Sequence, residues 1–360
     1  MKITIISRYI PGALAHFEEH LNDQENDYKS SLSTIISQVG DYNLFLKQEL
    51  EKRGHNVQFV IHRWHKGTEL LRREQNASTE TNDQEIIKKH IIDFNPSVVF
   101  LGSFFDLYDD FLKGIKESCK CQILSWISCP YPNDLSLKYI DKVFTAIPSH
   151  ADFFKTLKCE TETTVFGFPE DFKTSNNPKS IDVGFIGGVN GVLRKSNLHN
   201  YRTDLIKHVS EHVNLHKWGY GFTSNSKLKS AFKIMFRNKH ILKNYHGEIW
   251  GYKMLDKLSE FKIGINCHGE VASHFAINHR LFETTGVGTL LLTDDKKYLN
   301  RYFEPGKEVV SYKNPEDCVK KIRNLINSPE KIEEISKAGQ NRTHSEYKFS
   351  FFVDKFEKSL

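Results

Sequence analysis

The stretch from Tyr245 to Asp295 decides the fold: YHGEIWGYKMLDKLSEFKIGINCHGEVASHFAINHRLFETTGVGTLLLTDD. Apolar residues recur at helical spacing in GYKMLDKLSEF and HRLFETTG, and they run without interruption in KIGIN and TLLLT. Continuous apolar strands separated by amphipathic helices are typical of a parallel sheet that helices cover on both faces. The stretch therefore predicts an α/β fold of the Rossmann-like kind.

The same alternation extends in both directions from this stretch. Downstream, Asn314-Pro315 is expected to open a helix over PEDCVKKIRNLINS, and further helices are expected to the end of the chain. The strands expected upstream are ITIIS (3–7), VQFVI (57–61), SVVFLGS (97–103), QILSWIS (122–128), KVFTAI (142–147) and IDVGFI (181–186). The helices expected upstream are LFLKQELEKRG with a Gly54 stop, EIIKKHIIDF ending near Asn95-Pro96, SHADFFKTL with a Ser149 cap, and TDLIKHVSEHV.

A polar segment without either period, FGFPEDFKTSNNPKS, covers residues 166–180 and predicts a linker. We therefore expect two Rossmann-like domains facing a cleft, at 1–165 and 181–344. The last segment, 345–360, is expected to form a helix that crosses back to the first domain.

Composition excludes several classes of protein. The chain has 360 residues, 39% hydrophobic and 26% charged, with a formal net charge of +5. No apolar run approaches the roughly 18–20 residues of a membrane span, and MKITIISRYI predicts a first strand rather than a signal peptide. The six cysteines form no CxxC pair, so neither a zinc site nor a disulfide framework is predicted. We expect a cytoplasmic protein.

Several motifs in the Tyr245–Asp295 stretch and beyond it resemble those of one enzyme family. They are WGYKML, the strand carrying Asn266 and His268, NHRLFE at 278–283, Gly286 with Gly288, and FEPGKEVVSY. Together they resemble the donor-binding domain of glycosyltransferases with the two-domain GT-B fold, and within them the bacterial spore-maturation-type branch. The resemblance is strong over about 100 residues.

The resemblance implies that Glu283 accepts both ribose hydroxyls of a nucleotide; a solvated helix glutamate is the alternative. Many retaining members carry a second glutamate at a fixed earlier position, which Phe275 occupies here. His268 or Glu270, directly after the strand KIGIN, are candidates to substitute for it. Asn278 belongs to the same motif and is also predicted to bind the donor.

Glycines after the strand VGFI, Gly187 and Gly188, would let the backbone approach a diphosphate, or they serve close packing alone. Arg194 and Arg280 are candidates to stabilise the departing diphosphate. The two glycines at 286 and 288 are expected mainly to end a helix and allow close packing.

The catalytic base is sought after the N-terminal strands. His16 is expected to follow a Pro-Gly turn, and Asp106 follows SVVFLGS; these two are the predicted catalytic residues, with Asp134 a weaker candidate. Asp294-Asp295 is expected to be a turn, and no metal or other cofactor is expected. The basic stretch 227–245 predicts an amphipathic helix that packs on its domain, or one that contacts the inner membrane or a lipid-linked acceptor.

The sequence thus predicts a glycosyltransferase that moves a sugar from a nucleotide sugar to a hydroxyl group of a glycan or lipid-linked acceptor, in bacterial surface glycan assembly. A sugar-nucleotide epimerase on the same fold and a non-catalytic nucleotide-sugar or glycan binding protein remain open. A nucleic-acid binder ranks last, because the basic stretch has no accompanying recognition motif.

Overall fold

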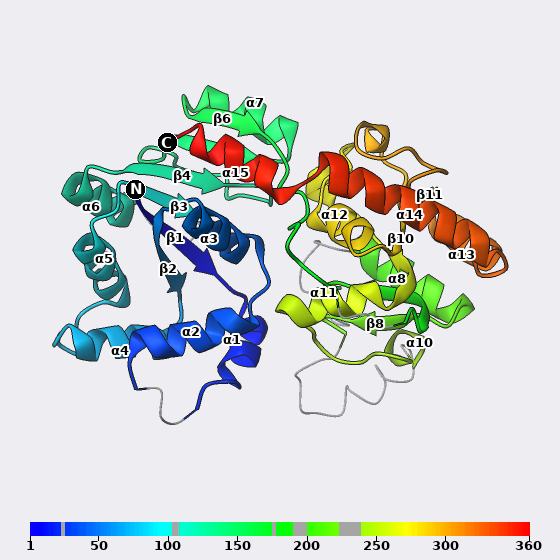
Figure 1. Cartoon of the computed structure of the whole chain (residues 1–360), viewed down its shortest axis with the longest axis horizontal. Helices are drawn as coiled ribbons and strands as arrows, with labels where there is room; N and C mark the ends of the chain where they lie inside the picture. The colour runs from blue at the N-terminus through cyan, green and yellow to red at the C-terminus, as the bar shows by residue number, and fades with distance from the viewer. Residues whose placement is uncertain (23–25, 103–106, 108, 175–177, 190–199, 223–238) are drawn as a thin grey trace. The chain divides into compact units, whose positions relative to one another are not determined.

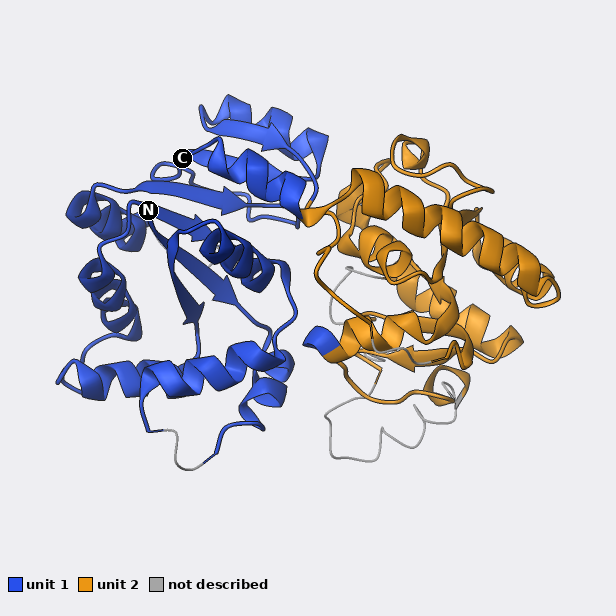
Figure 2. Cartoon of the chain, viewed as in Figure 1, with its two compact units in different colours: residues 1–165, 250–252, 350–360 blue, residues 166–249, 253–349 orange. Residues whose placement is uncertain are grey.

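The computed structural model describes residues 1–22, 26–102, 107, 109–174, 178–189, 200–222 and 239–360. The chain divides into two compact units, which Figure 2 colours separately. Unit 1 holds Met1–Val165, Trp250–Tyr252 and Ser350–Leu360, and unit 2 holds Phe166–Ile249 and Lys253–Phe349. Each unit is built around one parallel sheet.

Unit 1 contains a six-stranded sheet in the order β2-β1-β3-β4-β5-β6 (Figure 1). Its strands are β1 (Lys2–Arg8), β2 (Asn56–His62), β3 (Val98–Leu101), β4 (Gln122–Trp126), β5 (Lys142–Thr145) and β6 (Glu160–Thr163). All neighbouring pairs are parallel. The strand order reverses direction between β1 and β3, which is where doubly wound sheets bind ligands at their carboxyl edge.

Helices cover both faces of this sheet. They are α1 (Pro11–Glu18), α2 (Tyr28–Gln38), α3 (Tyr42–Lys52), α4 (His65–Glu74), α5 (Asp83–Phe94), α6 (Asp109–Cys119), α7 (Pro148–Thr156) and α15 (Phe349–Glu357). One face packs on α5, α6 and α7 through an aliphatic cluster that includes Val99 and Ile123. On the other face, Phe352 and Phe356 of α15 contact the ring of Phe144. Both faces can be buried because successive side chains of a strand point to opposite sides of the sheet.

Local sequence signals predicted α3, α5, α7 and α15, whereas α1, α2, α4 and α6 were not predicted. Gly54 (φ 87°) and Asn95 (φ 53°) end α3 and α5 in the left-handed region, as predicted. Two predicted details are wrong. Ser149 is not the cap of α7, because Pro148 already occupies its first turn and Ile147 precedes it. Pro11-Gly12 is not a turn but the start of α1, since proline is favoured at the first helical position.

Unit 2 contains a five-stranded parallel sheet in the order β11-β10-β9-β7-β8. Its strands are β7 (Ile181–Ile186), β8 (His216–Trp218), β9 (Phe261–Ile265), β10 (Leu290–Asp294) and β11 (Val310–Tyr312). Its helices are α8 (Asn200–His212), α10 (Lys239–Leu242), α11 (Gly251–Ser259), α12 (His279–Gly286), α13 (Pro315–Ile326) and α14 (Pro329–Glu346), with 3-10 turns at Glu270–Ala272 and Leu299–Arg301. The strand order of unit 2 reverses between β7 and β9.

The core of unit 2 is aliphatic. Side chains of β7, β9 and β10 pack on α8, α13 and α14, with Val183, Ile263, Leu292, Val209 and Ile322 fully buried. Asn314 caps α13 by accepting a hydrogen bond from the backbone of Asp317, as its Asn-Pro start predicted. This packing holds the carboxyl ends of the central strands in fixed register.

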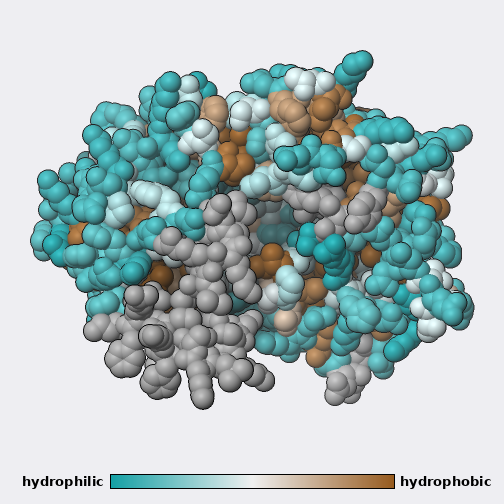
Figure 3. Space-filling view, turned by 180° about the vertical axis from the view of Figure 1, so that it is seen from behind, coloured by the Kyte–Doolittle hydropathy of each residue, from teal (hydrophilic) through white to brown (hydrophobic). Residues whose placement is uncertain are grey.

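None of the helices in the described ranges combines the length and apolar character that crossing a membrane requires. Figure 3 shows one face of the molecule, on which hydrophilic side chains predominate and hydrophobic ones gather in smaller groups. The predicted amphipathic helix over 227–245 lies outside the described residues up to 238, and only its end is seen, as α10.

Candidate functional site

Arg202 lies at the point where the strand order of unit 2 reverses. Its guanidinium donates hydrogen bonds to the carbonyl oxygens of Gly188 (3.2 Å), which follows β7, and of Cys267 (2.9 Å), which follows β9. In the described part of the chain it has no carboxylate partner, and its buried Nε makes no hydrogen bond. The switch point of the sheet therefore carries a positive charge that no neighbouring acid neutralises, which favours an anionic ligand.

A buried histidine and aspartate join the ends of β9 and β10. Both the backbone N–H of His268 (3.0 Å) and its Nδ1 (2.6 Å) bond to Oδ1 of Asp294. The carboxylate can only accept, so Nδ1 carries a proton, and in the neutral form of the ring Nε2 would be the unprotonated nitrogen. That Nε2 is buried and has no partner among the described residues.

The environment of Asp294 keeps it ionised. Burial raises the pKa of its carboxyl, but the charge and hydrogen bonds of His268 outweigh burial and leave that pKa below its usual value. Lys296 adds a further positive charge, with Nζ 3.6 Å from Oδ2. The predicted turn at Asp294-Asp295 is therefore wrong in its first residue: Asp294 ends β10 and is 6% exposed.

Two asparagines fix the start of α12 to the end of β9. The side chains of Asn266 and Asn278 exchange hydrogen bonds of 2.9 and 3.3 Å, and Asn278 also accepts from the backbone N–H of Leu281. Asn278 is thus the N-cap of α12. Because both ends of its amide are used within the protein, its observed role is to position α12.

Glu283 lies in α12 and is 8% exposed, so the alternative of a solvated glutamate is wrong. Its Oε2 lies 2.9 Å from Nη1 of Arg280, one turn earlier on the same helix. A buried carboxylate that has one cation beside it keeps free lone pairs, because a carboxylate offers about four acceptor sites. Glu283 can therefore accept further hydrogen bonds from a ligand.

The remaining predicted residues of unit 2 differ in their placement. The N–H of Gly187 donates to the carbonyl of Trp218 (3.0 Å), and a Cβ on Gly188 would meet the Tyr220 ring at 2.1 Å. Close packing between the loops after β7 and β8 is therefore the observed role of both glycines. Glu270 lies exposed on the 3-10 turn after Gly269, and Arg194 lies outside the described residues.

Gly286 and Gly288 confirm the packing role expected of them. A Cβ on Gly286 would meet the Phe168 ring at 2.3 Å, and Gly288 has φ 75° just after the end of α12. Only glycine adopts that φ without cost.

Unit 1 holds a carboxylate of a different kind at its own switch point. Asn43 of α3 donates to the hydroxyl of Ser7 (2.9 Å) near the end of β1, and a Cβ on Gly102, after β3, would meet the Asn43 side chain. Asp41 precedes them as the N-cap of α3 and accepts from the N–H of Leu44 (2.8 Å). Burial raises the pKa of Asp41 to about 6, despite that opposing hydrogen bond.

Of the two predicted catalytic residues, only His16 lies in the described part of the chain. His16 lies on α1, with Nδ1 3.4 Å from the carboxylate of Glu19. Asp106 lies outside the described residues. Sequence reasoning missed Asp41, Asp294 and Arg202; the signal for Asp294 was its place at the end of a strand adjacent to the one that carries His268.

Comparison with known proteins finds a matching family model and solved structures with a similar fold. Residues 202–357 match the family model described as glycosyl transferase-like. A search of curated proteins finds no match. Among solved structures, the chain is similar to sucrose-phosphate synthase from Thermosynechococcus elongatus, with TM-score 0.59 and 11% identity over 99% of this chain and 98% of that one.

Two further structures have the same architecture over their whole length. Anabaena HepE in complex with UDP-glucose matches with TM-score 0.59 and 11% identity over 100% of both chains. A glycosyltransferase from Rickettsia africae matches with TM-score 0.58 and 11% identity over 99% of this chain and 97% of that one. The predicted GT-B fold is confirmed, and the family match over residues 202–357 agrees with the predicted glycosyltransferase.

Proposed function

Because the chain carries a glycosyltransferase family domain on a GT-B fold, we propose that it transfers a sugar from a nucleoside diphosphate sugar to a hydroxyl group of an acceptor. UDP-sugars are the first donors to test, because several of the similar structures are complexes with UDP or UDP-glucose. The acceptor is a glycan or lipid-linked glycan of bacterial surface assembly, and the chain is of the spore-maturation type within the fold. The stretch 227–245 would contact the inner membrane near such an acceptor.

The buried carboxylate of Glu283 carries this proposal. It lies in the helix that Asn278 anchors to the end of β9. A buried acid with free lone pairs suits the paired hydroxyls of a ribose, because both can donate to one carboxylate. Arg280 neutralises Glu283 in the ligand-free state and lies beside the N-terminus of α12, where it can also face a diphosphate.

Arg202 and His268 supply the groups that a diphosphate requires. Arg202 brings an uncompensated positive charge to the switch point, and negative charge grows on the diphosphate oxygens as the sugar leaves. The unpartnered Nε2 of His268 is an acceptor in the neutral ring and becomes a donor when the ring takes up a proton. Asp294 would stabilise that protonated form, because its carboxylate is ionised beside it.

The reaction needs a destination for the acceptor proton. The acceptor oxygen forms a bond to the anomeric carbon, the bond from that carbon to the diphosphate oxygen breaks, and the electron pair leaves with the diphosphate. We assign the proton to Asp41, whose pKa of about 6 suits a group that is ionised before the reaction and accepts a proton during it. His16 and Asp106 stay the alternatives predicted from sequence.

The alternatives make different products. An epimerase would change the sugar while it is still attached to the nucleotide, and a binding protein would change nothing. The transfer proposed here needs no metal ion, because Arg202, Arg280 and helix N-termini supply the positive charge.

The test is mass spectrometry of the full chain incubated in EDTA with UDP-glucose, UDP-N-acetylglucosamine and other nucleotide sugars, with and without sugar acceptors. Release of free nucleoside diphosphate together with a glycosylated or hydrolysed sugar is expected, and Glu283→Gln is expected to lower it. Glu330→Gln, an exposed glutamate in the first turn of α14, is the matched control. Conversion of the nucleotide sugar to its epimer, or no turnover with any donor, would overturn the proposal.

A further inference from the structure

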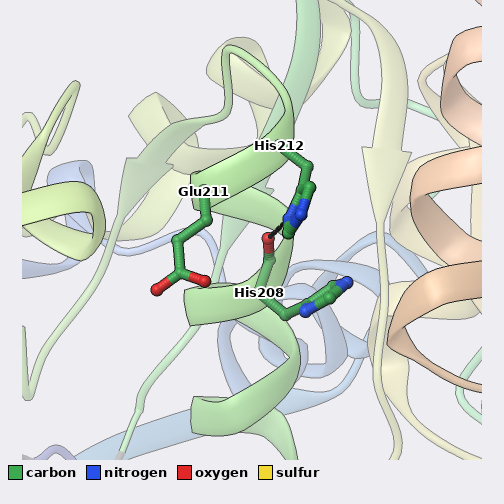
Figure 4. Close-up of side chains that lie close together, drawn as sticks. All are labelled: His208, Glu211 and His212. Carbon is green, nitrogen blue, oxygen red and sulfur yellow. Dashed lines mark hydrogen bonds between the residues drawn. The ribbon is translucent and has the colours of Figure 1, made fainter.

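Helix α8 carries a group of potential metal ligands that the transfer reaction does not use. His208, Glu211 and His212 each offer one nitrogen or oxygen atom, and these three atoms lie within 4.8 Å of one another. Figure 4 shows the three side chains on consecutive turns of the helix. No other three histidine, cysteine or acidic side chains in the described ranges approach one another in this way.

The two imidazoles are arranged as a pair of metal ligands would be. Their ring centroids lie 4.4 Å apart with an interplanar angle of 32°. Nδ1 of His212 is 2.8 Å from the backbone carbonyl oxygen of His208, to which it donates (Figure 4). Since a carbonyl accepts only, that nitrogen keeps the proton and Nε2 of His212 is left as the metal-binding nitrogen. Metal-bound histidines are commonly oriented in this manner.

The surroundings add negative charge to this group. Oε1 of Glu316, from α13, lies 3.9 Å from Nε2 of His208, so a second carboxylate is within reach of the same place. His212 is the last residue of α8, where the carbonyl ends of the helix dipole favour a cation. Two carboxylates and a helix C-terminus thus lie close to the two imidazoles.

A second pair of histidines in the chain has the same sequence spacing and shows whether that spacing alone brings the ligand atoms together. His16 on α1 and His20, two residues after the end of α1, repeat the pattern His-x-x-Glu-His, and His20 also bonds to the carbonyl of His16, at 3.2 Å. Their rings, however, lie 5.6 Å apart at 81°, and Nδ1 of His16 is 3.4 Å from the carboxylate of Glu19. The ligand atoms of that pair do not converge with a third, so spacing is not sufficient and the α8 arrangement is distinct.

We propose that His208, Glu211 and His212 bind one divalent transition-metal ion of the Zn²⁺ class at the surface of unit 2. Two imidazoles and a carboxylate suit zinc, cobalt, nickel or copper rather than magnesium or calcium. Water or Glu316 completes the coordination. Imidazole ligates only without its second proton, so binding weakens as the solution is acidified.

The ion has a structural role. Along α8, Arg202 and His212 are separated by about 15 Å at 1.5 Å per residue, so the ion does not touch the sugar-donor site. It would instead join α8 to α13, which already meet where Arg323 donates to the carbonyl of His212 (3.2 Å). The ion therefore stabilises the helix layer on which β7 and β9 pack.

The experiment titrates the full chain, without a polyhistidine tag and freed of metal by a chelator, with Co²⁺ and then Zn²⁺. Wild type is expected to bind one equivalent of Co²⁺ with visible d–d absorption, to lose this colour to Zn²⁺, and to gain a few degrees in Tm with saturating Zn²⁺, as expected for about 100-fold excess over Kd. His212→Ala and His208→Ala are expected to lose all three responses, and Glu211→Gln to weaken them. His20→Ala, in the His-x-x-Glu-His segment at residues 16–20, is expected to leave these three responses unchanged.

Thermal unfolding of each metal-free variant separates loss of ligand from loss of fold, because exposed substitutions usually change stability by less than about 0.5 kcal/mol. An intense thiolate-to-cobalt absorption would place the ion on a cysteine such as the exposed Cys129, and would overturn the proposal. So would absence of binding by wild type, or binding that His20→Ala abolishes and His212→Ala retains.

Discussion

Asp294, which ends β10 in unit 2, and Asp41, the partly buried N-cap of α3 in unit 1, have pKa values that are shifted in opposite directions. In unit 2, the pKa of Asp294 lies below its usual value because His268 outweighs the effect of burial. In unit 1, burial raises the pKa of Asp41 to about 6, and only backbone N–H groups and a tyrosine hydroxyl oppose it. The same residue type is thus held as a fixed charge at a strand end in unit 2 and is suited to accept a proton at a helix N-cap in unit 1.

The two units therefore place different kinds of side chain at the ends of their central strands. Unit 2 concentrates charged groups that are paired with one another or with carbonyls, as Arg202, His268 and Glu283 are, and this arrangement suits a nucleoside diphosphate. Unit 1 satisfies its strand ends with short hydroxyl and amide side chains such as Ser7 and Asn43. Unit 1 is therefore less suited to an anionic ligand, but its Asp41 carboxylate is suited to accept a proton.

The largest expected effect is on the transfer rate, and it follows from substitution of Asp41 in unit 1. Asp41→Asn should lower the transfer rate about 100- to 10,000-fold, because it removes the general base. In wild type the rate should rise with pH through about 6, where Asp41 ionises. Steady-state kinetics from pH 5 to 8 measure both, with His16→Ala as the alternative base. A normal rate in Asp41→Asn and a lost rate in His16→Ala would assign the base to His16.

The same variant separates function from stability. A carboxyl whose folded-state pKa is raised stabilises the fold below its unfolded pKa, near 4, and this contribution is lost as pH rises through about 6. Asparagine is as good an N-cap as aspartate, so Asp41→Asn should be more stable than wild type by about 2–3 kcal/mol at pH 7 and nearly equal to it at pH 4. Chemical denaturation at the two pH values checks this difference, and a less stable variant at pH 7 would contradict it.

The second effect is on the stability of unit 2, and it follows from substitution of Asp294. Asp294→Ala should destabilise unit 2 by about 3–5 kcal/mol, because it leaves His268 and a backbone N–H buried without a partner. Its lowered pKa means that the carboxylate stabilises the fold above the unfolded pKa and that this contribution is lost as acid protonates it. Hydrogen exchange should show faster exchange in β9 and β10 and unchanged exchange in the unit 1 sheet. Equal changes in both sheets would mean that the pair is not local to unit 2.

The smallest effect is on ligand affinity, and it tests whether Arg202 binds the phosphates of a nucleoside diphosphate. Arg202→Met should weaken nucleoside diphosphate binding about 10- to 100-fold, the range of one or two charged hydrogen bonds, and should change nucleoside binding little. Arg73→Met, an exposed arginine of unit 1, is the control. Calorimetry with UDP and uridine makes the comparison; equal losses for both ligands would show that Arg202 acts on the fold of the loops rather than on the phosphates.

Much of the fold follows from local pattern. Continuous β-branched runs marked the central strands, and residues such as Gly54 and Asn314 marked helix ends because each serves one backbone conformation or one orphan N–H. The edge strand β6, with the sequence ETET, was missed because it has no apolar alternation. It pairs with β5 in the parallel ladder, and Nζ of Lys142 on β5 lies 3.0 Å from Glu160 and from Glu162.

The site was less predictable, because its chemistry depends on neighbours that are far apart in sequence. Glu283 could be chosen from its motif, but its burial could not. Asp294 looked like a turn because its partner, His268, lies 26 residues earlier, and the pKa of Asp41 follows from burial that no local pattern reports. Arg202 was missed because its role depends on two loops that only the strand order brings together.

The central claim is that unit 2 binds a nucleoside diphosphate through Glu283, and isothermal calorimetry with UDP and the other nucleoside diphosphates tests it most directly. The account predicts that wild type binds at least one of them and that Glu283→Gln binds it about 10- to 100-fold more weakly, since a hydrogen bond to a charged group is worth about 1.5–3 kcal/mol. Glu330→Gln should bind like wild type. No binding by wild type, or equal affinity in Glu283→Gln, would contradict the claim.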